Sequence, residues 1–544
     1  SRQIGSLCGA TAGAGVAATL GSGRACDPAD LRLAELVILW GTNTRLTNRH
    51  LWPFVEEARA AGATVVVVDP IRTITASSAD WFVQPLPGTD VALMLAMMHV
   101  LIRDDLVDHE YIDQYTDGFD RLAAHVAGWT PERAAAVCGV AAEEIERLAT
   151  SYGTASPAFI RTLIGAEHHE NGATFFRTLA CLPTITGSWR HPGGGLARSV
   201  GTWSDVNVDD SVFDRVSFEV PERRGINMNH LGAVLTDPSL EPPVKALFVW
   251  NGNPLVTVPD AARIQAGLAR DDLFTVVSEQ FLTDTARYAD VIFPATTQLE
   301  QVDVVPAWGH LYLGWNEPAI APQGEAVPNT ELWRRLSRAM GFTEPELFED
   351  DETLLRSAVR GMDVDELREQ GFLRLDVPDE MLPYREGGFA TPSGRAMLAN
   401  DDLADPLPEF RAPVGAPHNG HEGSTLPLRL LTPKNHTRFL NTSYSHLPGH
   451  GDRETGPFVE IDPADAAARG IVEGAPVRVW NDRGELTLPA MLSDRLRPGV
   501  VAVPFGWWSE DGAPATANTL TSAADTDWGG GVAFFDTVVE VALA

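Results

Sequence analysis

Short apolar runs near the start of the chain are separated by segments with helical periodicity. Residues 36–40 read LVILW, a turn containing Asn43 follows, a helix is predicted over 55–61, and the next apolar run, TVVVVD, ends at Asp69. Apolar runs of this length, joined by helical segments, are typical of parallel strands in βαβ units. The pattern therefore predicts a parallel sheet with helices on its faces.

The same unit returns 210 residues later. ALFVW ends at Trp250, a helix is predicted over 261–269, and FTVVSE follows. Aligning the two regions without a gap gives ten identical positions between residues 37 and 90, where average residue usage gives about three or four by chance. The matches include Asn43 on Asn253, a polar loop position that packing does not require. Two related units predict two similar ligands at the carboxyl ends of the strands; two ordinary α/β halves that share only packing demands are the alternative.

The last quarter of the chain consists of short alternating runs and turn residues. The runs include LRLLT at 428–432 and PVRVW, which precedes the hairpin signal NDRG at 481–484. Residues 400–424 are rich in Asp, Pro, Gly and His, as in a surface linker. The predicted fold is α/β, with two Rossmann-like units related by an internal repeat and a C-terminal β-barrel domain. The predicted divisions are 1–155 and 156–399 for the two units, 400–424 for the linker and 425–544 for the barrel.

Composition narrows the classes of partner. The chain has 544 residues, with 41 basic and 74 acidic residues and a formal charge of −33, which repels nucleic acid and anionic membrane surfaces. No run approaches the roughly 18 to 20 apolar residues of a spanning helix, so direct membrane insertion is not expected. The four cysteines lie far apart without a Cys-X-X-Cys pair, which disfavours a disulfide scaffold or a zinc ribbon. The chain does not begin with Met, and its compartment cannot be inferred from this end.

Several ordered motifs carry a family resemblance. They are LAELVILWGTNTRLTNRH, GATVVVVDPIRTITASSADWFVQPLPGTDVAL, ALFVWNGNPLVTVPD, SEQFLTDTARYADVIFPATTQLE and the long stretch from VEIDPADAAARG to PFGWW. With these motifs the chain resembles the molybdopterin oxidoreductases of the dimethyl sulfoxide reductase superfamily from Cys8 almost to its C-terminus. The resemblance implies two pyranopterin guanine dinucleotides that hold one molybdenum or tungsten through their dithiolenes. This agrees with the two ligands inferred from the repeat.

The resemblance also assigns residues to the cofactor. The two turn loops would meet the phosphates, since backbone amides at a strand-to-helix turn suit pyrophosphate oxygens, and acids after the strands would hold guanosine. In the two units the residues so assigned are Gly41, Asn43, Asp69, Pro70, Thr89, Asp90, Asn253, Pro254 and Glu279, with Glu300 as a further candidate. In the C-terminal domain they are Thr432, Lys434, Asn435, His436, Asn441 and Asn518.

Cys8 stands in the small-residue stretch SLCGATAG, where a thiol is either a packed filler or a ligand. The resemblance places it at the position of the family's cysteine or selenocysteine metal ligand. A soft thiolate suits molybdenum or tungsten, and Gly9 and Gly13 allow close approach of the backbone. We expect Cys138 and Cys181, which lie in helical apolar contexts, to be core residues instead.

The segment from Gly165 to Gly195 resembles the substrate side of family members. Within it Arg177 falls where formate dehydrogenases place an arginine that orients formate, and His168 with His169 forms a candidate acid/base pair. The alternatives are a salt-bridged arginine and neutral core imidazoles.

Two departures bear on the reaction. No cysteines precede Cys8 for the family's [4Fe-4S] cluster, which is therefore expected in a missing N-terminal segment or in an iron–sulfur electron-transfer partner. Gly9 stands where formate dehydrogenases carry His. The chain therefore lacks a proton-handling group at this position, which makes formate a less favoured candidate substrate. The leading hypothesis is a molybdenum- or tungsten-dependent oxidoreductase that performs two-electron chemistry on a small molecule. A formate dehydrogenase-like catalytic subunit and a non-catalytic scaffold or electron-relay subunit of a respiratory complex are the alternatives.

Overall fold

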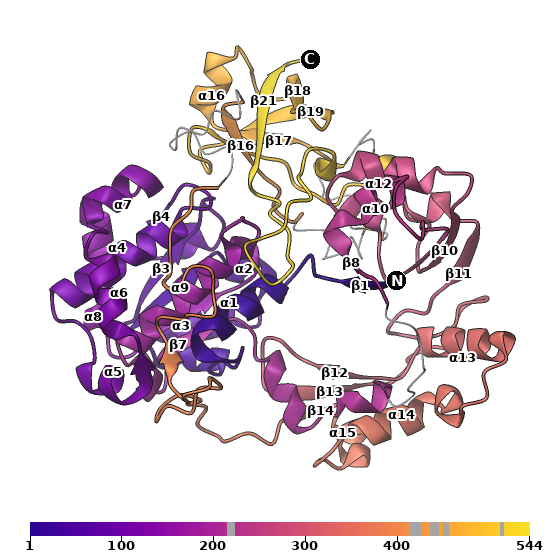
Figure 1. Ribbon diagram of the computed structural model, residues 1–544, viewed down its shortest axis with the longest axis horizontal. Coiled ribbons are helices and arrows are strands. Elements are labelled where there is room, and N and C mark those ends of the chain that lie inside the picture. The colour runs from indigo at the N-terminus through magenta and orange to yellow at the C-terminus, as the bar shows by residue number, and fades with distance from the viewer. Residues whose placement is uncertain are drawn as a thin grey trace.

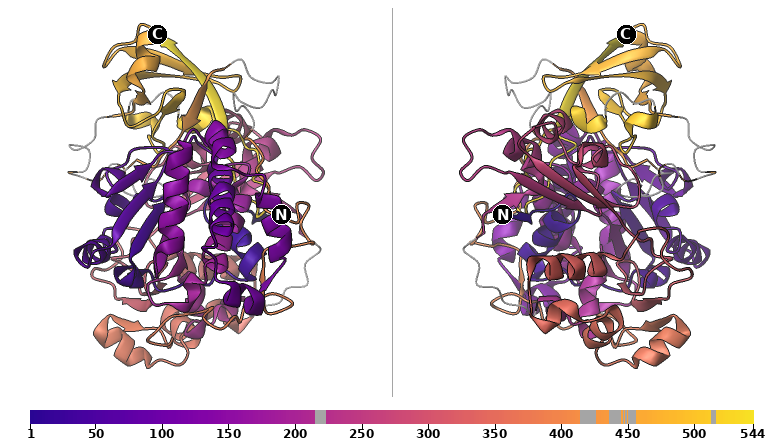
Figure 2. Two further views of the ribbon diagram at one scale, coloured as in Figure 1. Left: turned by 90° about the vertical axis from the view of Figure 1, so that its left-hand side faces the viewer. Right: turned by 90° about the vertical axis from the view of Figure 1, so that its right-hand side faces the viewer.

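The computed structural model of the chain describes residues 1–214, 223–413, 426–435, 445, 447, 449, 456–511 and 516–544. In Figure 1 a first α/β unit lies at the left, a second α/β unit at the right, a small sheet with helices below them, and a barrel above. Figure 2 shows the barrel at one end of the molecule and the small sheet region at the other.

The first unit is built on a five-stranded parallel sheet in the order β4-β3-β2-β6-β7. Its strands are β2 (Leu36–Trp40), β3 (Thr64–Val68), β4 (Trp81–Val83), β6 (Ala158–Thr162) and β7 (Gly195–Ala197). The continuous aliphatic sequences of β2 and β3 follow from burial on both faces of the sheet. The helices of this unit are α1 (Ala10–Leu20), α2 (Thr44–Thr47), α3 (Trp52–Ala60), α4 (Asp90–Arg103), α5 (His109–Tyr115), α6 (Phe119–Val126), α7 (Pro131–Cys138), α8 (Ala142–Thr154) and α9 (Gly172–Ile185).

The second unit repeats the centre of the first with three parallel strands in the order β11-β10-β9. These strands are β9 (Ala246–Trp250), β10 (Phe274–Glu279) and β11 (Val291–Pro294), and their helices are α10 (Leu231–Thr236), α11 (Pro254–Thr257) and α12 (Ala261–Leu268). The strand register is repeated as well, because Ser278 pairs with Trp250 in the way that Val68 pairs with Trp40. The repeat predicted from the sequence is therefore present in the backbone.

The chain then leaves the second unit for a separate antiparallel sheet. This sheet has the order β12-β13-β14, formed by β12 (Asp303–Pro306), β13 (Tyr312–Asn316) and β14 (Phe372–Arg374). Its helices are α13 (Asn329–Met340), α14 (Asp351–Ala358) and α15 (Val364–Gln370). One further short pair, β1 (Arg2–Ile4) with β8 (Gly225–Asn227), is parallel and joins the N-terminus to the second unit.

The C-terminal domain is the predicted barrel. It closes in the order β16-β20-β17-β19-β18-β21. Its strands are β16 (Leu428–Leu431), β17 (Val459–Ile461), β18 (Pro476–Trp480), β19 (Glu485–Leu492), β20 (Val500–Ala502) and β21 (Thr537–Leu543), and α16 spans Pro463–Ala468. The predicted hairpin is confirmed, because Trp480 pairs with Glu485 and the Asn481 amide donates to the Gly484 carbonyl over 3.1 Å.

The structure corrects the predicted boundary between residues 155 and 156. Strands β6 and β7 fall in the range 156–399 that was predicted for the second unit. However, β6 pairs along its whole length with β2 of the first unit, and β7 extends the same sheet. Later segments also return to the first unit, because β15 (Ala396–Met397) pairs with β5 (Thr116–Asp117). The described part of the predicted linker, 400–413, packs against the first unit as well, through the Asn400 side-chain amide that donates to the Ala18 carbonyl. A division by sequence position misses these crossings, since sheets join segments that lie far apart in the chain.

A stretch before β21, which we call the C-terminal strap (residues 524–536), runs down between the two α/β units (Figure 1, yellow). The Ser6 amide donates to the Gly530 carbonyl over 3.1 Å, and the Gly531 amide donates to Thr11 Oγ1 over 3.1 Å. The Asp527 carboxylate accepts hydrogen bonds from the amides of Ala173 and Thr174 at the start of α9. The strap thus joins the Cys8 turn, α9 and the barrel. Among the described residues, no helix is long and apolar enough to cross a membrane.

Candidate active site

The two turn loops after β2 and β9 share their internal hydrogen bonds. In the first, Thr75 Oγ1 donates to Asn43 Oδ1 over 2.7 Å and in turn accepts the Arg45 amide over 3.0 Å. In the second, the corresponding bonds join Thr285 to Asn253 over 2.7 Å and Leu255 to Thr285 over 3.0 Å. These residues correspond at the same offset of 210.

The backbone of both loops turns in the same way. Gly41 and its counterpart Asn251 both have a positive φ, 59° and 54°. Pro254 opens α11, where a missing N–H costs nothing. Asn253 is buried, and its Nδ2 has no hydrogen-bond partner among the described residues. A buried amide without a partner is costly, so this group is available to an acceptor on a bound molecule.

Acids follow the strands as the sequence predicts, although their bonding differs. Asp69 Oδ1 accepts the Ile71 amide over 2.9 Å, and burial raises the pKa of this carboxyl to about 7. Asp90, at the start of α4, accepts the Trp40 indole N–H over 2.8 Å, and burial raises its pKa. Burial likewise raises the pKa of Glu279.

Glu300 does not reproduce the environment of Asp90. Its Oε2 accepts both the amide and the hydroxyl of Thr297, and its Oε1 accepts the Gln323 amide over 2.8 Å, which lowers its pKa. Oε2 is therefore engaged within the loop after β11 and Oε1 by the segment after β13, and the next described element after this loop is the strand β12 rather than a counterpart of α4. Two residues near Asp69 and Asp90 also bond locally: the Pro70 carbonyl accepts Gln84 Nε2 over 2.9 Å, and Thr89 Oγ1 donates to the Leu86 carbonyl over 2.6 Å.

Cys8 lies immediately before α1, in a turn where its amide donates to Ser6 Oγ over 2.9 Å. Burial raises the pKa of the Cys8 thiol, Glu167 raises it further, and Lys434 and Arg198 oppose the shift. One carboxyl group and two cations from three distant segments therefore act on this sulfur. Of these three, sequence reasoning singled out only Lys434.

Glu167 is the most deeply buried of these ionisable neighbours, with 1% of its surface exposed. Its Oε2 accepts the Ala12 amide over 2.9 Å, whereas Oε1 has no partner among the described residues. Burial raises the pKa of Glu167 to about 8. At neutral pH this carboxyl therefore retains a proton beside Cys8.

The structure does not bring Arg177 to Cys8. Arg177 is buried on α9, where its Nη1 donates to the Asp405 carbonyl over 2.6 Å and its Nη2 to the Pro406 carbonyl. Helix α9 is buried on all sides, so periodicity could not indicate which of its faces meets the site. Cys138 and Cys181 are core residues, as expected.

The two histidines are bound by the C-terminal strap. His168 Nδ1 donates to the Val532 carbonyl over 3.2 Å, and burial lowers its pKa to about 3, with the Lys434 charge as a smaller cause. His168 is therefore neutral, which favours the core interpretation over an acid/base role. His169 Nδ1 donates to Asp536 Oδ1 over 2.6 Å.

The C-terminal residues approach from the barrel side. Thr432 is buried, Asn435 is half-buried, and the exposed Lys434 places its Nζ 4.7 Å from the centroid of the Phe505 ring. Asn518 Nδ2 donates to the Val256 carbonyl over 2.8 Å, so it braces α11 at the second loop. His436 and Asn441 lie outside the described residues.

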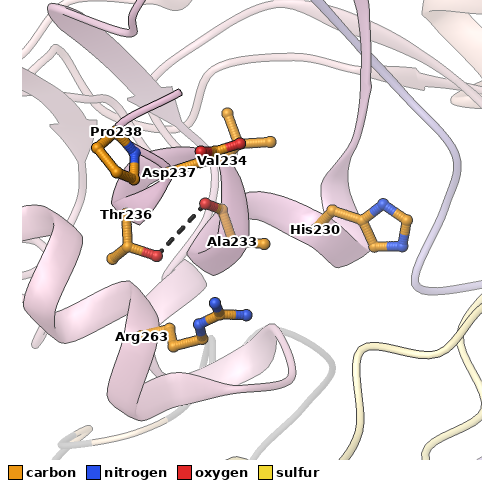
Figure 3. A pocket seen from close by; sticks show the side chains of 7 residues that line it. All are labelled: His230, Ala233, Val234, Thr236, Asp237, Pro238 and Arg263. Atoms are coloured by element: carbon orange, nitrogen blue, oxygen red, sulfur yellow. Dashed lines mark hydrogen bonds between the residues drawn. The ribbon is translucent and has the colours of Figure 1, made fainter. Parts of the chain in front are cut away.

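A cavity of about 500 Å³ lies apart from this set, beside α10 and α12 (Figure 3). Its ionisable side chains already have partners: His230 Nε2 lies 3.2 Å from Asp525 Oδ1, Arg263 lies 3.6 Å from Asp260, and Asp237 accepts the Ser239 hydroxyl over 2.7 Å. None of the predicted site residues lines it.

Comparison with known proteins agrees with this geometry. Residues 3–339 match the family described as molybdopterin oxidoreductase, and residues 428–539 match the molybdopterin dinucleotide binding domain. The chain is 38% identical to the probable oxidoreductase YoaE of Bacillus subtilis, over 98% of this chain and 78% of that protein. It is 29% identical to the F420-dependent formate dehydrogenase subunit alpha of Methanocaldococcus jannaschii, over 94% of this chain and 77% of that protein.

The fold is shared with a solved structure, acetylene hydratase from Pelobacter acetylenicus. The TM-score is 0.80 at 24% identity, and the match covers 99% of this chain and 81% of the other. The chain belongs to the molybdopterin oxidoreductase family and is an oxidoreductase of the dimethyl sulfoxide reductase superfamily. Its cofactor is bis(molybdopterin guanine dinucleotide) with molybdenum or tungsten.

The residues present fit that cofactor. Two loops with matching Thr–Asn hydrogen bonds agree in number with the two dinucleotides of that cofactor, and the buried Asn253 Nδ2 has an N–H donor without a partner among the described residues. The Cys8 thiol is a soft donor of the type that the metal prefers. The family resemblance seen in the sequence is thus confirmed.

Proposed function

We propose that this chain is a catalytic subunit in which Cys8 ligates the metal and a small anion reacts beside it. The observation that carries the proposal is the group of ionisable side chains around Cys8: the Arg198 guanidinium lies against the Cys8 turn, Lys434 also acts on the sulfur, and the buried Glu167 binds the Ala12 amide. Two cations near a soft ligand favour an anionic molecule through Coulomb attraction that is stronger than in bulk water. When bound, the metal and its dithiolenes supply two-electron redox chemistry.

The chain's own groups have separable roles in this proposal. Arg198 offers a planar fork of N–H donors that orients an oxyanion, and Lys434 adds a point charge. Glu167 uses Oε2 for the Ala12 amide, so Oε1 is the atom that holds the proton and can release it. The loop acids Asp69, Asp90 and Glu279 are proposed to hold the guanosine ends.

Metal content and the Cys8→Ala variant test this assignment. The full chain, produced in cells supplied with both metals, is expected to carry molybdenum or tungsten close to stoichiometry by plasma mass spectrometry. Cys8→Ala is expected to lose one sulfur from the metal's X-ray absorption shell together with activity. Stoichiometric metal with an unchanged sulfur shell and unchanged activity in Cys8→Ala would remove Cys8 from the mechanism. Absence of both metals would favour the non-catalytic scaffold.

Formate is the second candidate substrate, because a relative of this chain is named a formate dehydrogenase subunit. Arg198 lies near Cys8 and could orient the formate carboxylate, whereas the Arg177 guanidinium is bonded to the Asp405 carbonyl. Formate-dependent viologen reduction under anoxic conditions by the metal-loaded chain would support it, and its absence would exclude formate. Electrons must then leave the metal, and we propose an iron–sulfur centre in another segment or subunit as their acceptor.

A further inference from the structure

The guanidinium of Arg198 lies against the turn that carries Cys8. A Cβ atom added at Gly9 would be 2.8 Å from Arg198 Nη1, closer than non-bonded atoms approach. A Cβ atom at Gly13, one turn further along α1, would be 3.9 Å from Arg198 Nη2, which is ordinary contact. A side chain at position 9 would therefore force the end of the Arg198 side chain to move away from the turn.

A second arginine holds the backbone of Arg198. Arg161, on β6, is 1% exposed, and its Nη1 donates to the Ala197 carbonyl over 3.2 Å and to the Arg198 carbonyl. Its Nε has no partner among the described residues. Arg161 is thus a buried cation beside another cation, and within the described part of the chain its hydrogen-bond partners are carbonyls, an arrangement unfavourable for folding. Its contacts instead fix the point at which the chain leaves β7 and presents Arg198.

We propose that Gly9 and Arg161 are positioning residues that fix the Arg198 guanidinium against Cys8 and so make the site prefer anionic over neutral molecules. Gly9 leaves the space on one side, and Arg161 anchors the main chain on the other. The inference rests on the proposed function for the identity of the site, but its test needs neither metal nor substrate.

Arg177 provides a matched comparison for Arg161. It is also buried, its guanidinium also donates to two successive carbonyls, those of Asp405 and Pro406, and its Nε also lacks a partner among the described residues. Replacing either arginine removes the same kind of contact. Only Arg161 is bonded to the segment that carries Arg198, so only its replacement is expected to change the charge beside Cys8.

The test is alkylation of the metal-free full chain with iodoacetate, an anion, and iodoacetamide, its neutral analogue. In both reactions the Cys8 thiolate displaces iodide and forms an S–C bond. Both rates depend on the same thiolate, so their ratio cancels changes in the pKa of Cys8 and reports the local charge. The other cysteines are buried, and peptide mass spectrometry follows Cys8 by itself.

Arg198→Gln is expected to lower the iodoacetate-to-iodoacetamide ratio by about three- to tenfold, which corresponds to removing one charge near the sulfur. Gly9→Ala and Arg161→Gln, which displace that charge, are each expected to lower the ratio by up to the same factor. Gly13→Ala and Arg177→Gln are expected to leave it unchanged. An unchanged ratio in Gly9→Ala overturns the proposal even if Arg161→Gln does not fold. So does an unchanged ratio in Arg198→Gln. Metal analysis of the loaded chain tests the proposed function separately.

Discussion

At the residue scale, the acids that follow β3 and β10, Asp69 and Glu279, are half-buried, and loss of hydration raises the pKa of both. Asp69 has its pKa raised to about 7 by burial, with the neighbouring charge of Asp90 as a further cause. The carboxyl group of an unfolded aspartate titrates near 4. Asp69 is thus a group whose protonation differs between the folded and the unfolded chain, which makes stability depend on pH.

The sign of this dependence follows from the raised pKa. Between about pH 4 and pH 7 the folded chain retains a proton on Asp69 that the unfolded chain has lost, so rising pH favours unfolding. Asp69→Asn does not titrate and removes this contribution. The free energy of unfolding of the metal-free wild type, measured in urea, is therefore expected to fall relative to Asp69→Asn as pH rises from 4.5 to 7.5. Parallel curves for the two proteins would show that Asp69 ionises normally.

At the element scale, the two turn loops show what an internal repeat can predict. The identities at Asn43/Asn253 and Thr75/Thr285 were visible in the sequence, and the structure gives each pair the same hydrogen bonds. The role of the threonines was not predicted. Each threonine follows its asparagine by 32 residues, and only folding of the intervening helix and strand brings the pair together.

Removing these hydroxyls is expected to weaken both loops alike. Thr75→Val leaves the Asn43 side-chain carbonyl and the Arg45 amide without this partner, at a cost of about 1–3 kcal/mol. Thr285→Val leaves the Leu255 amide without its partner at a similar cost, while Asn253 Oδ1 still accepts the Thr285 amide over 3.2 Å. Both variants are expected to unfold at lower urea concentration and to retain less pterin dinucleotide on purification. Thr64→Val, an exposed strand position on β3, is the control and is expected to be close to neutral. A loss confined to one of the two loops would contradict their equivalence.

The elements that sequence reasoning misplaced explain the site residues that it missed. Strands β6 and β7 were assigned to a second domain, although they extend the first sheet. Glu167 and Arg198 both follow these strands at their carboxyl ends, where α/β sheets place functional groups. With β6 and β7 in the correct sheet, both residues would have been expected near Cys8. Arg177 attracted attention instead, because a helix buried on every face gives no sign of its orientation.

At the scale of the whole molecule, the regions are joined by segments far apart in the chain. The Cys8 turn is held by the strap through Gly530, and the second loop is braced by Asn518 from the barrel side. The sequence predicted two units and a barrel because each has its own periodicity. The sequence did not predict the course of the strap, because residues 524–536 show no helical or strand periodicity. Its position depends on long-range contacts such as the hydrogen bond from the Gly531 amide to Thr11.

Asp527 tests how much the strap contributes. Its carboxylate accepts the amides of Ala173 and Thr174 and the Thr174 hydroxyl at the start of α9. Asp527→Ala is expected to lower the free energy of unfolding by about 1–2 kcal/mol, as other N-cap losses do. Asp350→Ala, which removes a cap from the peripheral helix α14, is the matched control. If the strap joins the units, Asp527→Ala is also expected to lower the amount of metal retained on purification, whereas Asp350→Ala is not. Equal metal retention in the two variants would show that the Asp527 hydrogen bonds stabilise only the start of α9.

The excess of acidic residues acts on the molecule as a whole. A formal charge of −33 at pH 7 produces self-repulsion that destabilises the compact state and that salt screens over about 10 Å at 0.1 M. Raising NaCl from 0.05 to 0.5 M is therefore expected to raise Tm, by about 1 °C for each kcal/mol of repulsion relieved in a chain of 544 residues. Sucrose of equal osmolality is the control, because it acts through exclusion from the surface without screening charge. If Tm rises equally in sucrose, the stabilisation comes from exclusion of the solute from the protein surface and not from charge screening. If Tm falls with NaCl, the ion pairs that salt weakens contribute more to stability than the repulsion among the acidic residues costs.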